Sequence, residues 1–222
     1  MLNRKYFNLF QLLVAGASEV GKTSLIHRFT DDYFTLNNIN GIDFKLKIIK
    51  IKEKRIKLQI WDVVGCVSLR NYSHICYKGN EKNINCIIFL YDITNEISFK
   101  MIKECIEKIE DIKTINAYKI LVGNKCDSLD RVITEEEGKE LADNHKMDFI
   151  EVSAKSDKNI TELFYHIANE IFKIKVKNQT KGEKYKFQIQ NCAINIFNNL
   201  CNMFYFNLLL LIIILIILLK LL

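Results

Sequence analysis

Two glycines, a lysine and a threonine near the N-terminus have the spacing of a phosphate-binding loop. Residues 16–24 read G-A-S-E-V-G-K-T-S and match the pattern G-x-x-x-x-G-K-[ST]. The glycines allow a tight loop whose successive N–H groups point at one phosphate. Lys22 would reach the β- and γ-phosphates, and the Thr23 hydroxyl would be a ligand of Mg²⁺. The predicted nucleotide-binding residues here are Gly16, Ser18, Glu19, Val20, Gly21, Lys22, Thr23 and Ser24.

A second candidate for metal binding is Asp62, which follows an alternating apolar segment in the sequence W-D-V-V-G at residues 61–65. An acidic residue at a strand end, in the same chain as a phosphate loop, is the expected second anchor for Mg²⁺. The alternative is an Asp that caps the next turn, because Asp is common in turns. Thr23 and Asp62 are therefore the predicted metal ligands, with the turn reading of Asp62 left open.

The sequence G-N-K-C-D at residues 123–127 supplies a carboxylate that could select the base of a nucleotide. The Asp127 carboxylate could accept hydrogen bonds from both the N1–H and the exocyclic amine of guanine. Adenine offers no such pair of donors, and sites of this kind discriminate by roughly 10⁴ or more. An ordinary Asn/Asp turn after a strand is the alternative interpretation.

The composition is that of a cytosolic globular protein with an additional segment. The chain has 222 residues, a net charge of +6 and a hydrophobic fraction of 49%. Its lysines are scattered and form no basic patch interleaved with aromatic residues, which argues against nucleic-acid binding. Seven cysteines occur singly, without the C-x-x-C spacing of a zinc site, as in proteins that keep reduced thiols.

Apolar periodicity predicts strands that alternate with helices. Expected strands cover residues 8–15, 43–52, 54–62, 84–91, 118–123 and 148–152; expected helices cover 22–30, a segment capped by Asn95, 134–145, and a segment opened by Asn159. This order predicts an α/β fold: a six-stranded, mostly parallel, doubly wound sheet with one antiparallel edge strand and about five flanking helices. Each motif falls at the carboxyl end of a strand, where such sheets bind ligands.

Taken together, the motifs resemble those of Ras-superfamily small GTPases, most closely the Rab branch, over about Leu9 to Lys175. The matching segments are G-A-S-E-V-G-K-T (16–23), G-I-D-F (41–44), W-D-x-x-G (61–65), Y-D-I-T-N (91–95), G-N-K-C-D (123–127) and S-A-K (153–155). The resemblance implies a P-loop NTPase fold and binding of GTP or GDP with Mg²⁺. It implies effectors, an exchange factor and a GTPase-activating protein as partners. It also implies nucleotide binding by Asn124, Lys125 along the base, Asp127 at guanine, and Ser153, Ala154 and Lys155 at the other edge of the base.

Three departures from the family pattern bear on catalysis. Ile39 stands where Rab proteins have a Thr that gives Mg²⁺ its hydroxyl, and Cys66 replaces the Gln that orients the attacking water. Glu19 adds a carboxylate to the phosphate loop. A thiol cannot both accept from water and donate to phosphate as a carboxamide does, so Gly65 and Cys66 form a weakened catalytic position.

Two functions therefore remain open from the sequence. One is a Rab-like switch that regulates vesicle traffic with slow hydrolysis, and the other is a GTP-binding scaffold with negligible turnover. An ATPase or kinase is disfavoured by the N-K-x-D sequence that ends at Asp127.

The C-terminal segment differs from a prenylated Rab terminus. Residues 203–222 are about 20 residues long, enough to span a bilayer as a helix, and lysines precede them. The sequence thus predicts a GTPase domain at 1–176, a polar linker at 177–202 and a tail anchor at 203–222, with the domain on the cytoplasmic face of an intracellular membrane. The alternative is that the Leu/Ile tract is not native, for example translated non-coding sequence.

Overall fold

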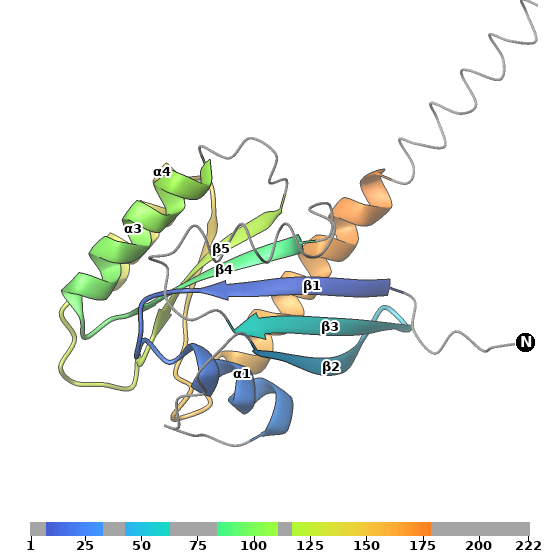
Figure 1. Ribbon diagram of the computed structural model, residues 1–222, viewed down its shortest axis with the longest axis horizontal. Coiled ribbons are helices and arrows are strands. Elements are labelled where there is room, and N and C mark those ends of the chain that lie inside the picture. The colour runs from blue at the N-terminus through green and yellow to red at the C-terminus, as the bar shows by residue number, and fades with distance from the viewer. Residues whose placement is uncertain (1–7, 33–42, 63–83, 111–116, 179–222) are drawn as a thin grey trace, which may run out of the picture. The chain divides into compact units, whose positions relative to one another are not determined.

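Six strands form one sheet, in which only one edge strand runs antiparallel to its neighbour (Figure 1). The computed structural model describes residues 8–32, 43–62, 84–110 and 117–178. The strands are β1 (Asn8–Ala15), β2 (Asp43–Ile51), β3 (Lys54–Asp62), β4 (Ile84–Asp92), β5 (Tyr118–Asn124) and β6 (Asp148–Glu151). Their order is β2-β3-β1-β4-β5-β6, with β2 antiparallel to β3 and all other pairs parallel. The predicted doubly wound α/β sheet is confirmed.

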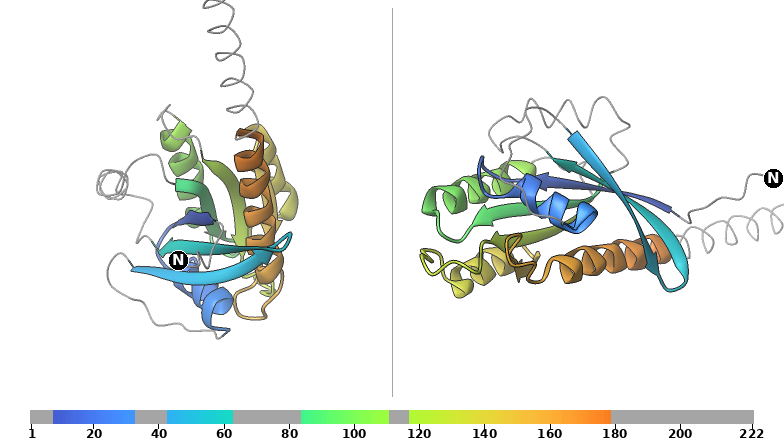
Figure 2. Two further views of the ribbon diagram at one scale, coloured as in Figure 1. Left: turned by 90° about the vertical axis from the view of Figure 1, so that its right-hand side faces the viewer. Right: turned by 90° about the horizontal axis from the view of Figure 1, so that it is seen from below.

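Helices cover both faces of this sheet (Figure 2). The described helices are α1 (Lys22–Asp31), α3 (Glu96–Glu110), α4 (Glu135–Asn144) and a last helix at 160–178. One apolar core contains side chains of α1 and the start of the last helix, and the other contains those of α3 and α4. The described residues hold four of the about five helices predicted, and residues 63–83, between β3 and β4, lie outside the description.

The strand patterns follow from which faces are covered. Residues 86–91 of β4 are all fully buried, as expected for a central strand between two helical layers. In β3, Ile56, Leu58 and Ile60 are fully buried and alternate with half-buried side chains. The β2–β3 hairpin turns at Lys52 and Glu53, which both have positive φ, as in a two-residue turn of type I′.

Side-chain caps define the starts of two helices. The Asn95 side chain accepts a hydrogen bond from the Ser98 N–H at 3.0 Å, which confirms the predicted cap of α3. At α4, the Thr134 hydroxyl accepts from the Glu137 N–H while the Glu137 carboxylate accepts from the Thr134 N–H. Both backbone donors are thereby satisfied, and the capping box predicted from the sequence is confirmed.

The chain divides into two units, Met1–Phe172 and Lys173–Leu222. Within the described ranges, no helix has both the length and the apolar character needed to cross a bilayer. The predicted tail at 203–222 lies outside those ranges, as does all of the linker beyond residue 178. The tail anchor therefore stays a prediction.

Tyr91 is a fully buried residue whose hydroxyl has no hydrogen-bond partner in the described part of the chain. We expect Tyr91→Phe to raise the free energy of unfolding by about 1 kcal/mol, since an unsatisfied buried polar group is unfavourable. Urea denaturation would measure this change. Tyr118→Phe is the matched control, because the Tyr118 hydroxyl bonds to Asp148 and His166 and its removal should give no gain. A less stable Tyr91→Phe protein would contradict the prediction.

Candidate functional site

The predicted phosphate loop connects the carboxyl end of β1 to the start of α1. Gly21 is the N-cap of α1 with φ of 94°, a conformation that L side chains rarely adopt. A Cβ at Gly16 would lie 2.4 Å from the Leu90 carbonyl oxygen, and one at Gly21 would lie 2.3 Å from the Asn124 amide nitrogen. The loop is therefore packed against the ends of β4 and β5, and both positions require glycine.

Lys22 is held inside this loop. Its Nζ donates to the carbonyl oxygens of Gly16, at 3.1 Å, and Ala17, at 2.6 Å, and the residue is only 7% exposed. The ammonium lies in the first turn of α1, where the helix dipole adds positive potential. Both features favour an anion, which is the ligand that the phosphate-loop interpretation predicts.

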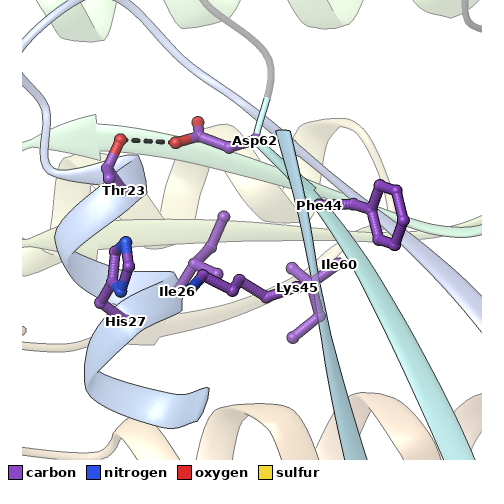
Figure 3. A pocket seen from close by; sticks show the side chains of 7 residues that line it. All are labelled: Thr23, Ile26, His27, Phe44, Lys45, Ile60 and Asp62. Atoms are coloured by element: carbon purple, nitrogen blue, oxygen red, sulfur yellow. Dashed lines mark hydrogen bonds between the residues drawn. The ribbon is translucent and has the colours of Figure 1, made fainter. Parts of the chain in front are cut away.

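Thr23 and Asp62, the two predicted metal ligands, lie side by side (Figure 3). The Thr23 hydroxyl donates to Asp62 Oδ2 at 2.5 Å. The other carboxylate oxygen, Oδ1, is buried and has no hydrogen-bond partner among the described residues. A hydroxyl and a carboxylate are oxygen donors of the kind that Mg²⁺ prefers, and a cation would satisfy the buried oxygen. The residues present thus fit Mg²⁺, which would neutralise phosphate charge when bound.

A small pocket next to these ligands separates α1 from β2 and β3 (Figure 3). Its lining residues are Thr23, Ile26, His27, Phe44, Lys45, Ile60 and Asp62. Below the metal ligands, His27 Nδ1 lies 2.8 Å from an Asp31 oxygen, and Lys45 Nζ lies 3.2 Å from the same oxygen. These contacts attach β2 to α1, and the sequence patterns did not predict them.

Asn124 connects the phosphate loop to the predicted base-binding loop. Its Nδ2 donates to the Val20 carbonyl oxygen at 2.8 Å, and its Oδ1 accepts from the Ala154 N–H at 3.2 Å. The residue is only 2% exposed, so water competes little for either bond. The side chain predicted to bind nucleotide is therefore the one that fixes the two loops relative to each other.

The two segments predicted to contact the base lie together at the ends of β5 and β6. Ser153 Oγ donates to Asp127 Oδ1 at 2.5 Å and accepts from the Ser156 N–H at 2.9 Å. The Cys126 N–H donates to the Val152 carbonyl oxygen at 3.1 Å, which continues the pairing of the strands. The Asp127 carboxylate is oriented by Ser153 and remains exposed for a ligand.

Two residues at this site were not assigned a role from the sequence. Arg28 of α1 donates from Nε to the Ala154 carbonyl oxygen at 2.9 Å and from Nη2 to that of Lys155 at 3.3 Å. Asp92 Oδ2 lies 2.5 Å from Lys125 Nζ. The position of Asp92 at the end of a buried strand was an available signal, the same one that identified Asp62. Arg28 had none, because its partners are main-chain oxygens about 126 residues away.

The predicted catalytic positions, Gly65 and Cys66, lie outside the described residues, as does Ile39. Their roles stay predictions. Glu19 is described: it is exposed and has φ of 67°, an uncommon conformation for a residue with a side chain.

Comparisons with known proteins show which family the sequence resembles. Residues 11–173 match the model of the Ras family. The chain is 41% identical over 179 residues to the GTP-binding protein ypt2 of Schizosaccharomyces pombe, covering 79% of this chain and 88% of that protein. It is 40% identical over 173 residues to the GTP-binding protein YPT1 of Saccharomyces cerevisiae, covering 77% and 82% respectively. It is 42% identical over 171 residues to the Ras-related protein Rab-8B of Homo sapiens, covering 76% and 81%.

Proposed function

The chain belongs to the Ras family of small GTPases, as a Rab-like member, and we propose that it is a GTP- and GDP-binding switch that regulates vesicle traffic. The observation that supports this proposal is the contact of Asn124 with both Val20 and Ala154, since it joins the loop predicted to bind phosphate to the loop predicted to bind guanine. Effector proteins, an exchange factor and a GTPase-activating protein are the partners that such a switch requires.

Each described site residue has a task in this proposal. The phosphate loop and Lys22 bind the phosphates, and Lys22 would exchange its bonds to the Gly16 and Ala17 carbonyls for phosphate oxygens. Thr23 and Asp62 would hold Mg²⁺. Asp127, oriented by Ser153, would accept both donors of the guanine edge. The predicted nucleotide-binding set is completed by Ser24, Asn124, Lys125, Ala154 and Lys155.

This function can be tested by identifying the nucleotide that co-purifies with the full-length chain in detergent. We expect guanine nucleotide close to one equivalent per chain on release and chromatography, and tight rebinding of GDP in the presence of Mg²⁺. Adenine nucleotide in the released fraction, or no nucleotide and no rebinding, would contradict the proposal.

The rate of hydrolysis is the property most affected by Cys66. We expect intrinsic hydrolysis at or below the roughly 10⁻⁴ s⁻¹ scale of unassisted small GTPases, and we expect Cys66→Gln to accelerate it, because a carboxamide can orient the attacking water. Single-turnover assays of the parent, Cys66→Gln and Cys66→Ala would measure this. A parent severalfold faster than Cys66→Ala would mean that the thiol has a catalytic role and that the weakened-site hypothesis is wrong.

We also propose that residues 203–222 attach the chain to the cytoplasmic face of an intracellular membrane. The support is their length and their Leu/Ile composition after a lysine-containing segment. In cells, the full-length chain should resist carbonate extraction, and truncation after residue 186 should make it extractable. A transcript that lacks this tract, or extraction of both forms alike, would contradict the tail anchor.

A further inference from the structure

The carboxylate of Asp92, at the carboxyl end of β4, is fixed by several hydrogen bonds. Asp92 is 5% exposed, and its Oδ1 accepts from both the N–H of Thr94, at 2.9 Å, and the Thr94 hydroxyl, at 2.8 Å. Its own N–H donates to Ser98 Oγ at 3.0 Å. Oδ1 and the main chain are therefore satisfied by neighbours in the sequence, and Oδ2 faces another part of the chain.

Oδ2 of Asp92 pairs with the lysine of the guanine motif. Strand β4 pairs with β5 so that Asp92 lies opposite Asn124, and the Ile93 N–H donates to the Asn124 carbonyl oxygen at 3.1 Å. The next residue, Lys125, has φ of 66°, and its Nζ lies 2.5 Å from Asp92 Oδ2. A buried carboxylate is strongly unfavourable without a cation or donors, so this ion pair constrains both side chains.

The two side chains differ in exposure, which indicates that Asp92 positions Lys125 and not the reverse. The Asp92 side chain is 7% exposed and cannot move without losing its bonds to Thr94, whereas the Lys125 side chain is 42% exposed. A lysine has a long flexible stem, and ordering it only when ligand binds reduces affinity. The fixed carboxylate thus orders the lysine before nucleotide arrives.

We propose that Asp92 is a positioning residue that holds Lys125 in place against the guanine base and thereby slows nucleotide release. This inference rests on the proposed function, in which the Lys125 stem lies along the base. Asp92 itself contacts no nucleotide; it acts through the ammonium of Lys125. If Asp92 acted only by fixing the local structure through Thr94 and Ser98, the effect of substituting Asp92 would not depend on Lys125.

A double-mutant cycle on the full-length chain separates these roles. The dissociation rate of a fluorescent GDP analogue would be measured for the parent, Asp92→Asn, Lys125→Met and the double variant. We expect each single change to raise the rate about tenfold, the size of effect typical of a lost charge-assisted contact. Because both changes remove the same contact, the double variant should be no faster than the faster single variant. Asp148→Asn is the matched control: the same substitution, at the start of β6, should leave the rate unchanged.

If the fold-increases caused by the two single changes multiply in the double variant, Asp92 has a structural role and the proposal is overturned. An unchanged dissociation rate in Asp92→Asn would also overturn it. If Asp92→Asn does not fold, Thr94→Ala gives the same test, since it removes a donor that fixes the carboxylate and keeps the ion pair. Thr94→Ala should raise the GDP dissociation rate by less than Asp92→Asn does, and this increase should disappear when Lys125→Met is also present. An increase that persists with Lys125→Met would overturn the proposal. A parent that binds no GDP would contradict the proposed function instead.

Discussion

Replacing Asp127 with Asn should transfer the base preference of the chain from guanine to xanthine nucleotides. Ser153 Oγ donates to Oδ1 of Asp127, so an Asn at this position would place its oxygen toward Ser153 and its amide nitrogen toward the base. An amide nitrogen cannot accept from the exocyclic amine of guanine, but it can donate to the 2-oxo group of xanthine. We expect the affinity for GTP to fall by about 10⁴-fold, as for other sites that read a buried donor pair.

Competition between fluorescent GDP and unlabelled GTP, XTP and ATP would measure this change in parent and variant. Ser153→Ala is a useful control, because it loosens the Asp127 carboxylate without changing its acceptors. That variant should weaken GTP binding less and keep guanine preferred. Equal affinity of the parent for GTP and ATP would contradict the role of Asp127.

Replacing Lys22 with Ala should reduce nucleotide affinity by at least about 100-fold, because it removes a buried charge that has no substitute in the phosphate loop. Its Nζ lies within the loop, bound to the carbonyls of Gly16 and Ala17, and the residue is 7% exposed. Thr23→Asn should also weaken binding, by more than tenfold, through loss of the hydroxyl next to Asp62.

Isothermal titration with GDP, in buffers with and without Mg²⁺, would measure both effects. Lys50→Ala provides the matched control, since Lys50 on β2 is mostly exposed and pairs with Glu53 of the hairpin turn. The Thr23→Asn effect should shrink when Mg²⁺ is absent, whereas the Lys22→Ala effect should persist. Unchanged affinity in both site variants would mean that the phosphate loop is not the binding site.

The strands and helix starts could be predicted from local patterns. The bounds of β1 and β3 match the prediction to the residue, because the apolar pattern of β1 stops before Gly16 of the phosphate loop and that of β3 stops at Asp62. Strand β4 runs one residue further than predicted, to Asp92, and this residue proved to be part of the site. The Asn95 cap and the capping box at Thr134 involve groups only three residues apart, so sequence alone contained both partners.

The contacts that assemble the site could not be predicted in the same way. Arg28 meets the carbonyl of Ala154, and Asn124 meets Val20, only because the sheet orders its strands as β1, β4, β5 and β6. That order depends on how the whole chain packs. Residue types at fixed spacing therefore identified the chemistry of phosphate and base, whereas the residues that align these groups required the structure.

The single amide of Asn124 joins the two halves of the ligand site, and this has a kinetic consequence. A thermal fluctuation that displaces Val20 pulls on the amide through Nδ2, and any displacement of the amide also strains the bond from the Ala154 N–H to Oδ1. The phosphate end and the base end are thus expected to open as one cooperative event. An exchange catalyst that pushes on either loop would then empty the whole site, and half-released nucleotide would be a short-lived species.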